Sequence, residues 1–88
     1  MNKPTTEILI DCALTDARFA GACESHARRC YSEARAAVRR DLETARMWRA
    51  EARRARDDAA RAVQGARRAL AGAVQVAAMR GARGLVAA

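Results

Sequence analysis

The strongest structural pattern lies in residues 27–76, ARRCYSEARAAVRRDLETARMWRAEARRARDDAARAVQGARRALAGAVQV. Stepping alternately three and four residues from Ala27 reaches 15 positions, of which 14 are apolar and one is Asp41. Ala fills ten of these positions but only five of the other 35, and all 13 Arg residues of the stretch lie elsewhere. This spacing follows one side of a supercoiled helix, so we expect that side to contact another helix. We call the apolar row the seam: Ala27, Tyr31, Ala34, Val38, Ala45, Trp48, Ala52, Ala55, Ala59, Ala62, Ala66, Ala69, Ala73 and Val76.

The composition predicts an all-α fold. Ala, Arg and Glu favour helix, strand-forming residues are sparse, and the only proline is Pro4. Gly21 is the best place for a break. We predict a single helical domain over residues 1–88, with a short first helix over 6–20, one long helix over 22–80 and a flexible tail over 81–88.

The shortage of large core residues predicts self-association. The chain has 88 residues, 24 of them Ala, and a buried Ala stabilises a core much less than a buried Leu. The seam also continues backward through Glu24, Ala20, Ala17, Ala13 and Ile10, beside a second row of Ile8, Cys12, Phe19 and Cys23. We expect a coiled-coil or helical-bundle homo-oligomer, a dimer first and a tetramer second, with the N-terminal segment in its core.

The acidic residues on the seam, Asp41 and Glu24, have two interpretations. They could fix the register by pairing with Arg residues of a partner helix. The plainer alternative is that they lie where the seam opens and Leu42 rotates inward.

The charge distribution favours an acidic partner for the second half of the chain. The net charge is +7, and from Ala59 onward there are five Arg residues and no acid. Protein, nucleic acid and a membrane surface would all satisfy such a charge. The excess of Arg and Ala is also typical of a GC-rich bacterial or phage genome. There is no transmembrane segment of 18 apolar residues and no secretory signal, so we expect a cytoplasmic protein, in the host cytoplasm if phage-encoded.

The residues Cys23, His26 and Cys30 raise the question of metal binding or catalysis. Cys23 and Cys30 are two turns, about 10 Å, apart on a continuous helix, so a closed zinc site would need a break or Cys12 from another chain. His26 and Cys30 can touch, but no third orienting group or oxyanion loop accompanies them. We therefore predict no metal, no cofactor and no enzymatic activity.

Two sets of residues are candidates for binding a partner. Trp48 interrupts the small-residue seam and Met47 lies next to it, and Trp flanked by Arg is a frequent interface anchor. The alternative is a Trp in the core of the homo-oligomer. The acid-free basic set comprises Arg61, Arg67, Arg68, Arg80 and Arg83.

These features favour a small non-enzymatic interaction protein, such as a phage or mobile-element factor that inhibits or adapts a bacterial protein. The alternative is a basic nucleic-acid-binding protein acting through Arg–phosphate contacts. A coiled-coil spacer in a larger assembly is a third hypothesis.

Overall fold

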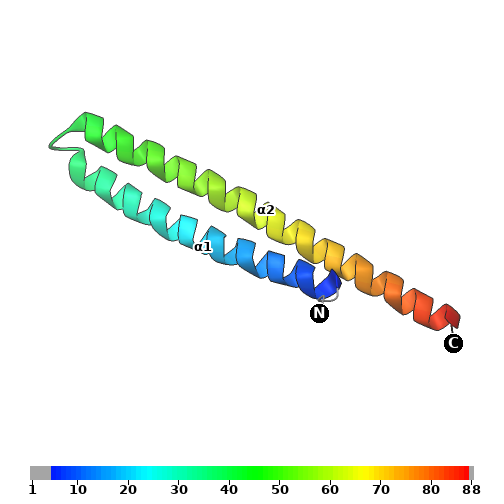
Figure 1. Ribbon diagram of the computed structural model, residues 1–88. Helices are drawn as coiled ribbons and strands as arrows, with labels where there is room; N and C mark the ends of the chain where they lie inside the picture. The colour runs from blue at the N-terminus through cyan, green and yellow to red at the C-terminus, as the bar shows by residue number, and fades with distance from the viewer. Residues whose placement is uncertain (1–4, 88) are drawn as a thin grey trace.

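The chain folds as an extended hairpin of two antiparallel helices (Figure 1). The computed structural model describes residues 5–87, with side chains as far as Arg83. Helix α1 runs from Thr5 to Ala37 and helix α2 from Leu42 to Ala87. The Cα trace measures 72 × 23 × 12 Å, and its radius of gyration is 20.1 Å. A compact chain of this length would have a radius of about 12 Å, so the hairpin is a rod.

The predicted helix bounds are wrong, although the all-α class is confirmed. The first helix is long rather than short, because Gly21 continues it without a break or a positive φ. The long helix does not run unbroken over 22–80, since the chain reverses between Ala37 and Leu42. The segment predicted as a flexible tail is helical through Ala87, and residue 88 lies outside the described residues.

Asp41 makes the reversal possible by capping α2. Its Oδ1 accepts hydrogen bonds from the backbone N–H groups of Glu43 (3.0 Å) and Thr44 (3.3 Å), and its Oδ2 accepts one from Thr44 Oγ1 (2.7 Å). These bonds satisfy N–H groups that the first turn of a helix leaves unpaired. Asp41 is thus a cap rather than a seam residue, and Leu42 is exposed rather than turned inward.

The core between the helices consists almost entirely of Ala. Its buried members are Ala13, Ala20, Ala27, Cys30, Ala34 and Ala37 on α1, and Ala45, Ala52, Ala55, Ala59 and Ala73 on α2. From Ala45 to Val76, every predicted seam position of α2 is buried or half-buried. The seam is therefore covered, but by α1 of the same chain.

On α1 the predicted row is only half right. Ala27 and Ala34 are buried, but their inward neighbours are Cys30 and Ala37. Tyr31 is half-buried at the edge and Val38 is exposed. Both choices alternate steps of three and four, and the narrow gap selects the smaller side chains.

The same correction applies to the backward continuation of the seam. Ala13 and Ala20 are buried, whereas Ile10, Ala17 and Glu24 are exposed. The second row, predicted to lie in a core, is also largely outside: Ile8, Cys12 and Phe19 are exposed and Cys23 is half-buried.

Glycines in α2 set the register of the far half of the hairpin. A Cβ at Gly65 would lie 2.7 Å from Asp16 Oδ2, and one at Gly72 would lie 3.5 Å from Leu9 Cδ1. Leu9 thus lies opposite Gly72, and Asp16, seven residues later on α1, lies opposite Gly65, seven residues earlier on α2. Where α1 carries a larger inward side chain, α2 has no side chain opposite it.

Helix α2 is longer than α1 and extends past its start (Figure 1). Leu9 faces Gly72, so Thr5, one turn earlier, is level with about Val76. The residues of α2 beyond Val76, which we call the overhang, have no α1 residue of the described range 5–37 beside them. Neither helix, over the residues described, has an apolar stretch long enough to cross a bilayer.

Candidate partner-binding surface

The largest side chains lie outside the Ala core, which is the reverse of an ordinary globular protein. Of the large apolar residues between Thr5 and Arg83, eleven are exposed, and the most exposed of these are Val74 (69%), Met47 (68%) and Phe19 (55%). Exposed apolar side chains that gather on one face are typical of interaction sites. Their positions along the two helices therefore identify candidate surfaces.

Met47 and Trp48 line an open groove of about 610 Å³ near the turn. Thr44, Ala50, Glu51 and Arg54 complete its walls. Trp48 is half-buried at a seam position, and Met47 lies on the outside beside it. The two residues that the sequence singled out as partner anchors thus line one groove.

A second groove, of about 370 Å³, lies next to the first and is formed by both helices. Phe19, Ala22, Cys23 and His26 come from α1, and Glu51, Arg54, Ala55 and Asp58 come from α2. Glu51 and Arg54 line both grooves and separate them. We call the two grooves together the lateral strip.

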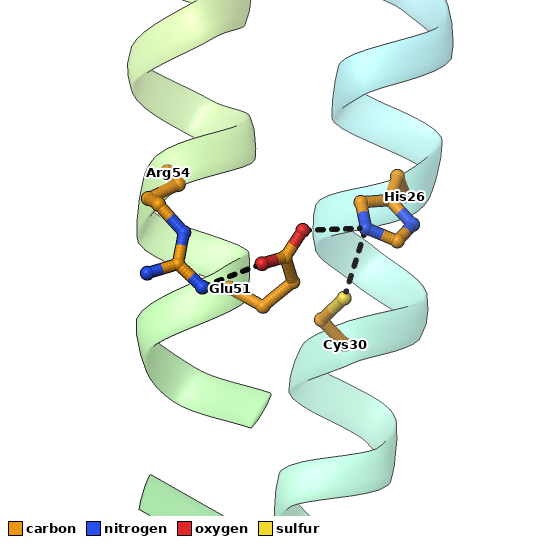
Figure 2. Close-up of polar contacts among 4 residues, drawn as sticks. All are labelled: His26, Cys30, Glu51 and Arg54. Carbon is orange, nitrogen blue, oxygen red and sulfur yellow. Dashed lines mark hydrogen bonds and ion pairs between the residues drawn. The ribbon is translucent and has the colours of Figure 1, made fainter. Parts of the chain in front are cut away.

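A polar cluster forms the middle of the lateral strip, as Figure 2 shows. Arg54 Nη2 donates to Glu51 Oε2 at 2.6 Å, and Glu51 Oε1 lies 3.2 Å from His26 Nε2 across the hairpin. The hydrogen bond from Arg54, followed by that from His26, lowers the pKa of Glu51 below its ordinary value. Glu51 thus stays ionised and links the two helices.

The His26–Cys30 pair lacks the geometry of a catalytic triad. Cys30 Sγ lies 3.5 Å from His26 Nε2, the same nitrogen that contacts Glu51 (Figure 2). A nucleophile–base–acid triad needs the acid on the other ring nitrogen, so that one nitrogen is free to take the proton of the nucleophile. Cys30 is also only 1% exposed, which closes its sulfur to a substrate. Its burial fits the role of a small apolar core residue.

The structure does not assemble the Cys and His residues into a metal centre. Across residues 5–87, no group of three or more His, Cys, Asp or Glu side chains is arranged to hold a metal ion. Cys12 is exposed on the outside of α1, and Cys23 is half-buried.

On the opposite side of the hairpin from the lateral strip, Arg56 lies over Tyr31. The guanidinium carbon is 5.9 Å from the centre of the ring. A hydrogen bond with Tyr31 raises the pKa of Arg56 above its ordinary value. Both residues lie beside the core positions of their helices, so this contact closes the second edge of the Ala core.

The acid-free basic residues do not form one cluster with Met47 and Trp48. Arg61, Arg67 and Arg68 are exposed along the middle of α2, while Arg80 and Arg83 are exposed on the overhang. Arg61 is paired with Asp58 one turn earlier. The predicted partner-binding residues thus divide between a groove near the turn and a basic end.

Sequence reasoning missed the contribution of α1 to the lateral strip. The pairing of His26 with Glu51 joins residues 25 positions apart and depends on the register of the two helices. Phe19 belongs to the second apolar row with Cys12 and Cys23, and that row predicts a core position for it. A helical wheel centred on Ala20 and Ala27 would have placed Phe19 at the edge.

The comparisons find no relative from which a function could be inferred: no family model matches the chain, and neither the curated proteins nor the solved structures contain a match.

Proposed function

We propose that this protein is a small non-enzymatic interaction protein that binds a helix of a protein partner along the lateral strip. The observation that carries the proposal is the arrangement of two apolar anchors, Met47 and Phe19, on either side of the Glu51–Arg54 ion pair. Apolar anchors with adjacent charged groups are the usual composition of a groove that holds an amphipathic helix.

The geometry favours a helical ligand in particular. From Met47 to Asp58 the strip spans about 16 Å of helix α2, which corresponds to three turns of a helix lying beside it. Apolar residues of the ligand would contact Met47, Trp48 and Phe19, and polar residues would face Glu51 and Arg54. Because the hairpin is already folded around its Ala core, binding requires little ordering of this chain.

The proposed biological role is inhibition or adaptation of a bacterial protein, by a chain that a phage or another mobile element encodes. Support comes from the base composition implied by the Arg and Ala excess, and from the absence of a catalytic arrangement at His26 and Cys30. A protein that acts only by occupying a helix of its target needs no further site.

Replacing an anchor by a charge tests this proposal. We expect Met47→Lys and Phe19→Lys each to reduce, by about tenfold, the amount of the same bacterial proteins that the immobilised protein captures. The reason is that a charge in an apolar contact costs more than about 1.4 kcal/mol of binding free energy. Ile8→Lys is the matched control, since Ile8 is similarly exposed but lies outside the strip. Quantitative mass spectrometry measures the capture. Equal recovery with all three variants would contradict the proposal.

A second candidate function, nucleic-acid binding, is favoured by the exposed basic residues from Arg61 onward, among which no acid occurs. Phosphate contacts would make duplex binding weaken steeply as salt increases. A gel shift with duplex DNA at low and moderate salt separates the two functions. A salt-sensitive shift that Arg67→Glu with Arg68→Glu abolishes, and Met47→Lys leaves unchanged, would favour the nucleic-acid function.

A further inference from the structure

The hairpin has two broad faces, and the face opposite the lateral strip is marked by the contact of Arg56 with Tyr31. Arg28 and both of these residues line one groove of about 480 Å³, so Arg28 lies on the same face. Residues seven positions apart share one side of a helix, and residues three apart are neighbours. The face therefore consists of four rows at seven-residue spacing, which pass through Tyr31 and Arg28 on α1 and through Arg56 and Arg53 on α2. We call it the Tyr31 face.

Most of the exposed large apolar side chains belong to the Tyr31 face. Of the eleven such residues between Thr5 and Arg83, four lie on the opposite broad face: Ile8, Phe19, Met47 and Met79. The other seven fall on the rows of the Tyr31 face: Ile10, Leu14, Val38, Leu42, Val63, Leu70 and Val74. Val38 and Leu42 flank the turn, and the remaining five gather toward the open end of the hairpin, away from the turn.

The same face is strongly basic. Its rows hold two acids, Glu7 and Glu24, and seven Arg residues, all exposed: Arg28, Arg35, Arg46, Arg49, Arg53, Arg56 and Arg67. The equivalent rows of the opposite face hold three acids and four Arg residues: Glu33, Glu51, Asp58, Arg29, Arg54, Arg61 and Arg68. The ion pairs Arg54–Glu51 and Arg61–Asp58 lie on that opposite face, and within residues 5–83 none of the ion pairs uses a guanidinium group of the Tyr31 face.

A flat anionic surface fits both features of the Tyr31 face. The Cα trace is only 12 Å thick, because the two helices lie side by side (Figure 1). From Ile10 to Val38 the face extends about 42 Å along α1, and a partner helix of ordinary length, about 10 to 14 residues, would cover less than half of it. A nucleic-acid duplex would neutralise the Arg residues but leave the apolar side chains in water. A bilayer with anionic headgroups contacts the whole face at once.

We propose that the Tyr31 face binds the surface of a bilayer that contains anionic phospholipids. The rod lies flat, and Leu14, Leu70 and Val74 enter the boundary between the headgroups and the acyl chains. The exposed Arg residues near the turn donate to the lipid phosphates, whose charge is opposite to theirs. Arg67, among the apolar residues toward the open end, directs its charged end to the headgroups while its aliphatic stem stays with the apolar side chains.

This proposal is independent of the lateral strip. With the Tyr31 face on the bilayer, the lateral strip faces away from it, so a membrane-bound copy could still bind a helical partner. The two proposals rest on different residues, and each could fail without the other.

Matched charge reversals test the basic part of the face by co-sedimentation with vesicles. We expect the protein to bind vesicles of phosphatidylcholine mixed with phosphatidylglycerol, and vesicles of phosphatidylcholine alone at least about tenfold more weakly. Arg28→Glu with Arg53→Glu should weaken binding to the anionic vesicles by about tenfold or more. Arg61→Glu with Arg68→Glu makes the same change in net charge on the opposite face. It should weaken binding by less than about threefold, because salt screens charges about 10 Å or more from the bilayer.

Apolar variants test insertion without changing the net charge. Leu14→Gln with Leu70→Gln should weaken binding to the anionic vesicles by about tenfold, because two large side chains no longer leave water. Met47→Gln with Phe19→Gln is the matched control on the opposite face and should leave vesicle binding unchanged. Circular dichroism verifies that every variant is helical.

Three results would overturn the proposal: no binding to the anionic vesicles, equal losses with the two charge-reversal pairs, or binding that Leu14→Gln with Leu70→Gln leaves unchanged. A gel shift of duplex DNA that depends on Arg28 and Arg53, in a protein that does not bind the vesicles, would also overturn it and identify nucleic acid as the partner of this face. Loss of captured protein partner in Met47→Lys concerns the proposed function alone.

Discussion

The two halves of the hairpin are built from the same repeat but are packed differently. Near the turn, Ala45, Ala52, Ala55 and Ala59 are all buried, with Ala52 entirely inaccessible. Toward the open end, Ala13 and Ala73 are buried, but Ala62, Ala66 and Ala69 are only half-buried. There α1 contributes Leu9 and Asp16 to the contact, and α2 accommodates them with Gly72 and Gly65.

An Ala repeat thus defines where two helices can pack together but not how tightly they pack. The turn half has the Asp41 cap, the His26–Glu51 contact and the Tyr31–Arg56 contact. We therefore expect the turn half to be the more stable part and the open half to open first.

Thiol labelling should show the largest difference between the halves. Cys30 is buried near the turn and Cys12 is exposed near the open end. We expect an alkylating reagent to modify Cys12 faster than Cys30 by on the order of a hundredfold, because Cys30 reacts only after the hairpin opens locally. Peptide mass spectrometry after timed labelling measures both rates. In denaturant the two cysteines should react at similar rates. Similar rates in the native protein would contradict the expectation that the turn half is more stable than the open half.

Enlarging seam residues compares the halves directly. Ala52→Leu should lower the free energy of unfolding by about 3 kcal/mol, because no space exists for the larger side chain. Ala69→Leu, at a half-buried position, should lower it by about 1 kcal/mol or less. Denaturant titration followed by circular dichroism gives both values. Ala60→Leu, next to the seam and exposed, is the control and should change the free energy by less than about 0.5 kcal/mol. The comparison fails if Ala69→Leu proves the more damaging.

The Glu51 cluster should give the smallest effect, visible as a pH dependence. Its neighbours hold the pKa of Glu51 below the ordinary value of 4.5, so its contribution to stability is present above that pH. This contribution is lost as the pH falls through the lower pKa of the folded state. Glu51→Gln should therefore reduce the melting temperature near neutral pH and become indistinguishable from wild type in acid.

The control for the pH experiment is Glu33→Gln, at an exposed site on α1. Thermal melts of both variants, compared with the wild type across the acidic range, isolate the Glu51 contribution from that of other carboxylates. A Glu51→Gln deficit that persists unchanged in acid would mean that packing, rather than charge, links Glu51 to His26.

Much of α2 could be predicted from the sequence, and much of α1 could not. On α2 none of the seam positions from Ala45 to Val76 carries an Arg, and the structure buries or half-buries all of them. On α1 the smaller residues Cys30 and Ala37 face inward in place of Tyr31 and Val38. Periodicity alone cannot distinguish these two rows, because both advance by alternate steps of three and four residues. The distance between the helices selects the row with the smaller side chains.

The reversal of the chain was missed because its signal is short. No Gly or Pro occurs between Ala37 and Leu42, and the seam spacing continues through Asp41 in phase. Asp is nevertheless a preferred residue at the start of a helix, and Asp41 forms the cap through its bonds with Glu43 and Thr44. The partner anchors Met47 and Trp48 were identifiable from one helix, whereas Phe19 and His26 join them only through the register of two.

The seven-residue spacing of the buried Ala residues bears on how the two helices are aligned along their axes. Buried Ala residues recur every seven positions on both helices, so sliding one helix by a heptad would again place methyl groups against methyl groups. Registers that differ by one heptad should therefore have nearly the same packing energy. The four residues that join α1 to α2 allow only one of these registers. In a chain cut at Arg40, the alignment would depend on the contacts that only one register allows: those at Gly65 and Gly72, the His26–Glu51 contact and the Tyr31–Arg56 contact.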